Sequence, residues 1–213
     1  MLVRRIYSRP GHCGRIMSMF TFHLLIALLV LAQASGAAPQ VGPASKNLTD
    51  ARYRISFEYP EDYTLIKSAA AVENGDPEGI FNTPDEWLVA TVEMPGGQYA
   101  GTDFKQALFT VTVEPKTAAA PCLDWPKVHD DLTGRDARVD AIPFRRVEDG
   151  SAGAGTQYWD IIYYGHANHV CYGIRLRLIT GGLHMAEGIK AVDQQAVMER
   201  MGRILASVKL RQR

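Results

Sequence analysis

The stretch that decides the fold is Gln157–Tyr164, with the sequence QYWDIIYY, followed by Val170–Thr180, with the sequence VCYGIRLRLIT. Both runs are rich in aromatic and branched apolar residues, which favour strands. Every second residue from Tyr172 to Leu178 is apolar, and Arg175 and Arg177 occupy positions between them. That alternation is typical of a half-buried strand. The short connection between the two runs predicts an antiparallel hairpin.

Further strands and one clear helix surround this hairpin. The helix begins at the capping residue Asp193, runs to about Ala206, and carries apolar residues at helical spacing. A short strand over 208–210 and weaker helices over 66–73 and 125–132 are also predicted. The remaining strand signals cover residues 53–59, 63–66, 87–93, 107–113 and 139–147. The predicted fold class is α+β: an antiparallel β-sheet covered by helices, chiefly the C-terminal one.

The first 34 residues have the organisation of a secretory signal peptide. Four arginines precede the apolar run Phe20–Leu31, and the small-residue cleavage pattern Ala32–Ala34 follows it. An uncleaved anchor is the alternative, but this run is shorter than the roughly 20 residues that span a bilayer. We therefore expect a signal peptide over 1–34, a flexible linker over 35–51 and a single globular domain over 52–213. The expected location is periplasmic or secreted, with membrane contact only through the signal segment before cleavage.

The charge balance argues against nucleic acid as a partner. The chain has 23 basic and 23 acidic residues, but the signal segment holds four of the basic residues and none of the acidic ones. The mature part, with 19 basic and 23 acidic residues, has a net charge of −4. Binding to phosphates needs a basic face.

Two cysteines remain after cleavage, because Cys13 leaves with the signal peptide. An even pair in an exported protein suggests a disulfide between Cys122 and Cys171. Closing that loop would stabilise the fold by about 4 kcal/mol. Two unrelated reduced thiols are the alternative. A nucleophilic Cys122 is a further alternative, but the sequence offers no identifiable base beside it.

Two short motifs resemble a known family. Phe57–Tyr63, with the sequence FEYPEDY, resembles the opening strand and turn of PsbP-like and DcrB-like exported domains. Met201–Leu210, with the sequence MGRILASVKL, is similar to the last helix and strand of that family. The resemblance implies an α/β/α sandwich around an antiparallel sheet over residues 52–210. It also implies a binding or assembly factor without catalysis, and it assigns no functional residue.

Three histidines are candidate metal ligands. His166 and His169 lie near the predicted hairpin turn, and His184 follows further along the chain. Imidazole is a good ligand for zinc or copper. On an extended strand the first two would point to opposite faces, so a shared metal requires the turn between them. Polar histidines at an exposed hairpin tip are the alternative.

Arginines on neighbouring strands are candidate ligand-binding residues. Arg175 and Arg177 share one face of their strand, and at most one residue of Arg145–Arg146 can join them there. Several guanidinium groups together could bind a carboxylate or phosphate. Glu148 and Asp160 are near enough to neutralise them, so an ion-paired sheet face is the alternative.

Aromatic residues cluster along the same hairpin. Tyr158, Trp159, Tyr163, Tyr164 and Tyr172 cannot all point to one side of the sheet. An exposed row would form a surface for a ligand or partner, and Tyr164 is the aromatic residue assigned to the arginine site. Packing in the core under the helix is the alternative.

No sequence motif for catalysis or for a cofactor is present. The glycine-rich stretch Gly150–Gly155 does not follow the dinucleotide pattern and is not followed by a helix, so it is interpreted as a flexible connection. Hydrolase and zinc-protease motifs are missing as well. These observations favour a non-enzymatic binding or accessory module of the cell envelope, without a cofactor. Its expected partner is an unidentified envelope or extracellular protein or a small ligand. A metal-binding protein and a hydrolase with an unrecognised site are the alternatives.

Overall fold

The predicted hairpin is at the centre of the fold. In the computed structural model of the chain, strands β8 (Thr156–Ala167) and β9 (Val170–Gly181) pair antiparallel along their whole length. Asn168 and His169 form the two-residue turn, and both have positive φ angles, 52° and 63°. Such angles at both central positions are the signature of a type I′ turn, whose twist matches that of the strands.

The chain divides into two units, Met1–Val41 and Gly42–Arg213, and all described residues belong to the second. The structure describes residues 44–67, 80, 83, 85–124, 134–182 and 188–211. The expected signal peptide therefore lies outside the described residues.

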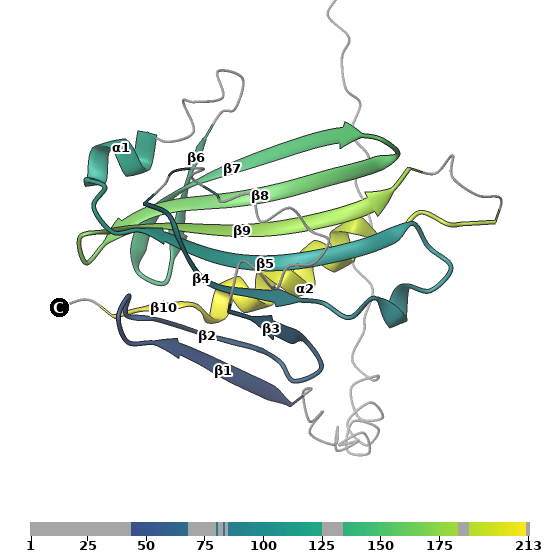
Figure 1. The fold of residues 1–213 in the computed structure, drawn as a ribbon, viewed down its shortest axis with the longest axis horizontal. Helices are drawn as coiled ribbons and strands as arrows, with labels where there is room; N and C mark the ends of the chain where they lie inside the picture. Colours follow the sequence, from purple (N-terminus) through teal and green to yellow (C-terminus); the bar gives the residue numbers. More distant parts are fainter. Residues whose placement is uncertain are drawn as a thin grey trace, which may run out of the picture. The chain divides into compact units, whose positions relative to one another are not determined.

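A seven-stranded sheet is built around the hairpin in the order β3-β4-β5-β9-β8-β7-β6, and every neighbouring pair is antiparallel (Figure 1). We call it the large sheet. Its other strands are β3 (Thr64–Ile66), β4 (Trp87–Glu93), β5 (Phe104–Glu114), β6 (Arg135–Val139) and β7 (Ile142–Gly153).

Strands β6 and β7 differ from the prediction in two respects. The single strand expected over 139–147 is two strands, because the chain reverses at Asp140, which has a φ of 54°. The glycine-rich stretch is not a loop, since Gly150–Gly153 continues β7 and pairs with β8. The turn is confined to Ala154 and Gly155, with φ angles of 48° and 74°. Residues of low strand propensity are held in this strand by pairing with β8.

A separate three-stranded sheet, β1-β2-β10, accompanies the large sheet. It consists of β1 (Ser45–Asp50), β2 (Ile55–Pro60) and β10 (Lys209–Leu210). Residues 45–50 were expected to be linker, so the folded part begins earlier than residue 52. In β1 only Leu48 is buried, and the strand is held by its antiparallel pairing with β2.

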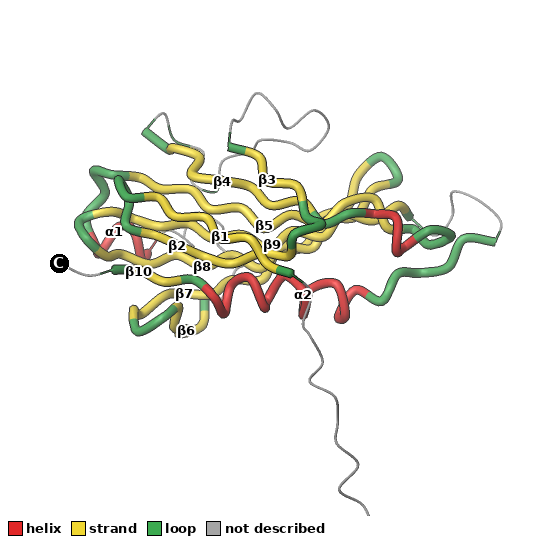
Figure 2. The backbone as a smooth tube through the Cα atoms, turned by 90° about the horizontal axis from the view of Figure 1, so that it is seen from below, coloured by secondary structure: helices red, strands yellow, loops and turns green. Residues whose placement is uncertain are grey.

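Helix α2 (Gln194–Ser207) covers one face of the large sheet, as predicted. Asp193 caps it by accepting a hydrogen bond from the backbone nitrogen of Ala196 at 3.0 Å. The helix contacts β2, β5 and β9, and Figure 1 shows it passing behind β5. Figure 2 shows the same helix running along one side of the strands. Its buried residues join Tyr172, Ile174 and Leu178 of β9 in the main core.

The other face of the large sheet carries the short helix α1 (Ala119–Asp124), which contacts β8 and β9. A 3-10 helix, η2 (Gly96–Tyr99), connects β4 and β5. The predicted α+β class with antiparallel sheets and covering helices is confirmed. The weaker helices expected over 66–73 and 125–132 lie outside the described residues, except that Ile66 ends β3 and Lys67 follows it. None of the described helices is long and apolar enough to cross a membrane.

Candidate functional site

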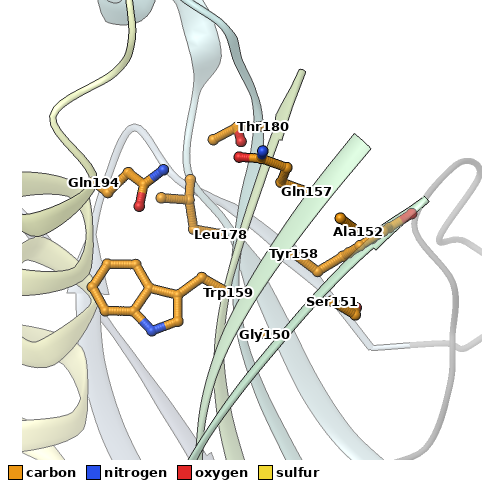
Figure 3. Close-up of a pocket in the computed structure, with 9 residues that line it drawn as sticks. All are labelled: Gly150, Ser151, Ala152, Gln157, Tyr158, Trp159, Leu178, Thr180 and Gln194. Carbon is orange, nitrogen blue, oxygen red and sulfur yellow. The ribbon is translucent and has the colours of Figure 1, made fainter. Parts of the chain in front are cut away.

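A pocket of about 300 Å³ lies on the α2 side of the large sheet. Figure 3 shows Trp159, Leu178 and Gln194 on this side, with Gln157 beside its register partner Thr180. We call it the Trp159 pocket. Its lining residues are Gly150, Ser151, Ala152, Gln157, Tyr158, Trp159, Leu178, Thr180 and Gln194.

Small residues on β7 make room for this pocket. Gly150 is the register partner of Trp159, and Ala152 is the register partner of Gln157. Strand alternation places these four residues on the same face, so β7 adds almost no side-chain volume there. A Cβ atom built on Gly150 would approach nothing closer than 3.8 Å, the distance to the carbonyl oxygen of Tyr158. The glycine-rich stretch therefore hollows the surface beside the indole.

The pocket combines a flat apolar wall with uncharged polar groups. Trp159 is half-buried and packs against the main core. The carboxamides of Gln157 and Gln194 are exposed. Thr180 is 2% exposed, and its Oγ1 has no hydrogen-bond partner among the described residues. Its Oγ1 is inaccessible to solvent, so the exposed carboxamides are the polar side-chain groups that a ligand can meet in this pocket.

The predicted arginine site lies on the opposite face of the same strands. Arg177 donates three hydrogen bonds to Asp160: from Nε to Oδ1 at 2.8 Å and to Oδ2 at 3.2 Å, and from Nη2 to Oδ2 at 2.7 Å. The guanidinium also lies over the ring of Tyr158, 5.4 Å from its centroid. Arg177 and Asp160 are 6% and 5% exposed. The negative charge of Asp160 therefore neutralises Arg177 inside the protein, as one of the alternatives expected.

The structure also brings Arg175 and Tyr164 to this face, and both are buried. Burial raises the pKa of Tyr164 well above its ordinary value, and the positive charge of Arg175 opposes that shift. The predicted trio of Arg175, Arg177 and Tyr164 thus shares one face of the sheet but offers little accessible surface to a ligand. Ligand binding by these three residues stays a prediction.

The other arginines follow the predicted alternation. Arg145 faces Tyr164 in the register, whereas Arg146 faces Tyr163 on the α2 side and donates a hydrogen bond to its hydroxyl at 3.2 Å. Arg146 also forms an ion pair with Glu148. Only one of the two arginines therefore joins the face of Arg175, as expected.

The aromatic cluster is divided between the two faces. Trp159, Tyr163 and Tyr172 lie on the α2 side and contribute to the main core or pack against it. Tyr158 and Tyr164 lie on the other side, and Figure 3 shows Tyr158 pointing away from Trp159. The residues therefore do not form one exposed row.

Cys122 of α1 and Cys171 of β9 form a disulfide, as the sequence predicted, with their Cα atoms 5.6 Å apart. Both are fully buried in a small apolar cluster with Ile80, Val147 and Tyr164. The bond attaches α1 to the face of the sheet opposite α2. Disulfides persist in oxidising compartments, so this bond indicates a non-cytoplasmic location.

Of the three predicted metal ligands, His184 lies outside the described residues. His166 is on β8 opposite Cys171, and His169 is exposed in the turn. Within the described part of the chain, no group of three histidine, cysteine, aspartate or glutamate residues could hold a metal ion. The metal site stays a prediction.

A second pocket of about 310 Å³ is lined by residues of β2 and α2 and of the loops beside them. Arg200 and Arg203 contribute positive charge to it, and Glu58 and Asp62 contribute negative charge. Burial raises the pKa of Tyr63 in its wall, with Arg200 as the main opposing influence. Arg200 donates a hydrogen bond to Gln98 and lies over the ring of Tyr99, so it is already engaged within the protein.

Comparison with solved structures found chains of similar fold at low sequence identity. No protein-family model and no curated protein sequence matches it. The solution structure of cyanobacterial PsbP (CyanoP) from Synechocystis sp. PCC 6803 is similar in fold, with a TM-score of 0.48 and 14% identity. That similarity covers 83% of this chain and 99% of the cyanobacterial one.

A crystal structure from Bacteroides thetaiotaomicron VPI-5482 is similar at a comparable level, with a TM-score of 0.47 and 10% identity. The match covers 78% of this chain and 48% of the Bacteroides chain, so this protein spans about half the length of that relative. Both similarities concern the fold alone.

Proposed function

We propose that this protein is an exported, non-enzymatic binding or accessory module of the cell envelope, and that its ligand occupies the Trp159 pocket. The single observation that supports this is the pocket itself. It combines a half-buried indole with two exposed carboxamides. Ligand sites are typically concave and largely apolar, with a few polar groups that converge.

The expected compartment is consistent with such a role. The buried disulfide is typical of proteins outside the cytoplasm. Residues 1–34 have the basic region, apolar core and small residues of a signal peptide, which supports export to the periplasm or beyond. The proposed membership in the PsbP-like family rests on the two terminal motifs, Phe57–Tyr63 and Met201–Leu210.

Export is tested by the mass of the mature protein. The full chain is produced in a bacterial host and recovered from its periplasm. We expect a mass that lacks residues 1–34 and is two hydrogens lower than that of the reduced chain. A full-length, reduced protein retained in the cytoplasm would contradict this part of the proposal.

Binding is tested by thermal unfolding in the presence of a compound panel. The panel contains neutral saccharides, nucleosides, amino acids, organic acids and fatty acids. A compound at 100 times its Kd stabilises the folded state by about 2.7 kcal/mol. For a chain of this size that corresponds to a rise in Tm of roughly 5–11 °C.

The control for this experiment is a filled pocket. Ala152→Phe adds a large side chain beside Gln157 and should abolish the rise in Tm. Ala141→Phe adds the same side chain at an exposed turn position outside the pocket and should preserve it. If no compound raises the Tm of the wild type, or if a compound raises the Tm of Ala152→Phe by the same amount, the pocket is not the binding site.

A further inference from the structure

We propose that the ligand of the Trp159 pocket is a neutral saccharide, with one sugar ring stacked on the indole of Trp159. This inference rests on the proposed function and names the chemical class of its ligand. The argument starts from charge. None of the nine residues that line the pocket is charged. Phosphates and carboxylates are recognised mainly by charge-assisted hydrogen bonds, which this lining does not supply.

The indole provides the surface on which a sugar ring can stack. Trp159 is half-buried, and its packing against the core holds the ring in place. Figure 3 shows the ring on the helix side of the strands. One face of a pyranose ring presents C–H groups and is apolar, while its rim carries hydroxyls. A rigid aromatic side chain offers a large contact area at low entropic cost.

The polar groups around the indole match the rim of such a ring. Each carboxamide of Gln157 and Gln194 offers both a donor and an acceptor, and a sugar hydroxyl needs both. Both carboxamides are exposed, so a ligand can reach them from the pocket.

The size and openness of the pocket suit one ring of a longer chain. Its volume of about 300 Å³ is at the lower limit for small-molecule sites. Gly150, Ser151 and Ala152 are exposed along its β7 side, so further sugar units can extend over small side chains into solvent. An apolar ligand would instead displace water from the carboxamides without replacing its hydrogen bonds.

The test is isothermal titration of the mature, disulfide-bonded protein with neutral trisaccharides. The probes are α- and β-linked glucose, galactose, mannose and N-acetylglucosamine trisaccharides. We expect at least one trisaccharide to bind. Trp159→Ala should weaken its affinity about tenfold or more, because tryptophan is enriched among the residues whose truncation to alanine costs most binding energy. Trp159→Phe keeps an aromatic face and should retain most of the affinity.

Matched variants distinguish the pocket from other surfaces. Gln194→Ala removes one carboxamide and should weaken binding, whereas Gln195→Ala, the adjacent exposed residue on α2, should not. Trp87→Ala removes an indole outside the pocket, on a residue that is 53% exposed. This variant should bind the trisaccharide with the affinity of the wild type. The assignment of the sugar to this pocket is overturned if four proteins bind the trisaccharide with equal affinity: the wild type and the Gln194→Ala, Trp159→Phe and Trp159→Ala variants.

Different experimental results would contradict the saccharide inference and the proposed binding function. If no trisaccharide binds but another compound stabilises the wild type and not Ala152→Phe, the saccharide assignment is wrong and the binding function stands. If neither trisaccharides nor any compound of the panel depends on the pocket, both are wrong.

Discussion

At the scale of single residues, the ion pair between Arg177 and Asp160 is almost entirely removed from water. Breaking a buried pair leaves an uncompensated charge in the interior, which typically costs 3–5 kcal/mol. We expect Asp160→Ala to lower the free energy of unfolding by about that amount, as measured by urea denaturation.

The exposed pair between Arg146 and Glu148 is the control. Its side chains are 25% and 47% exposed, so we expect Glu148→Ala to change stability by less than about 1 kcal/mol. The double variant Asp160→Leu with Arg177→Met should recover much of the loss, since neither charge remains. An Asp160→Ala variant as stable as Glu148→Ala would show that the charge of Asp160 is not needed.

Tyr164 gives the protein a pH dependence in the alkaline range. Burial raises the pKa of its hydroxyl above the ordinary value of 10.0, while the charge of Arg175 opposes the shift. The unfolded chain therefore releases this proton at a lower pH than the folded chain. The stabilising contribution is complete below about pH 10 and decreases as the pH rises toward the pKa of the folded state.

We expect Tyr164→Phe to lose less stability than the wild type when urea unfolding is measured from pH 8 to 11. Burial also raises the pKa of Tyr63 and Tyr172, so the variant keeps part of the dependence. An identical slope in both proteins would contradict the account of Tyr164.

The sequence predicted which residues share a face, but it did not predict the pocket. Strand alternation placed Arg175 with Arg177, and Asp160, one of the two acids expected to neutralise that face, pairs with Arg177. Glu148, the other acid, pairs instead with Arg146 on the α2 side. The Trp159 pocket depends on small residues of one strand lying beside a tryptophan of the next. That relation follows from the register of β7 and β8. Gly150–Gly153 has low strand propensity, so the sequence did not indicate that this stretch is part of a strand.

At the scale of elements, the cap of α2 is the most direct case. Asp193 accepts the backbone hydrogen bond of Ala196 at 3.0 Å, and capping residues typically contribute about 1 kcal/mol. We expect Asp193→Ala to lower the Tm by about 2–4 °C in a thermal scan. Gln195→Ala in the first turn removes no capping group and should have a smaller effect; an equal loss in both variants would contradict the role of the cap.

Elements with strong local signals were predicted well, and elements without them were missed. Helix α2 has a capping residue and an apolar stripe, and the β8–β9 hairpin has a long alternating pattern. Strand β1 has only one buried residue, Leu48, among exposed polar ones, so its sequence resembles a linker. It is a strand because it pairs with β2, and the residue pattern of one strand does not show which strand it pairs with.

At the scale of the whole molecule, the disulfide joins α1 to the large sheet across 49 positions of the chain. Cross-linking a loop of that length restricts the unfolded chain and contributes about 4 kcal/mol. We expect the double variant Cys122→Ala with Cys171→Ala to lose roughly that stability in urea unfolding, and we expect the same loss for the wild type in reductant. Unchanged unfolding of the reduced protein would show that the bond is dispensable for the fold.

The α+β class was predictable from the strand and helix patterns, but the division into two sheets was not. The sequence indicated one antiparallel sheet, whereas β2 pairs with β1 and the C-terminal β10 in a separate sheet. Lys209–Leu210 is too short to indicate its partner, and it lies about 150 residues from β2 in the sequence. Which strands pair over such separations is decided by packing of the completed core rather than by local pattern.

The central claim, that a ligand occupies the Trp159 pocket, is tested most directly by the indole N–H resonances of the protein in a ¹H–¹⁵N NMR titration. The chain has three tryptophans, and the Trp159→Phe and Trp87→Ala variants assign two of the signals. On addition of the stabilising compound or trisaccharide, the account predicts that the Trp159 signal shifts with saturation while that of Trp87 stays in place. A Trp159 signal that does not move while the compound demonstrably binds would contradict it.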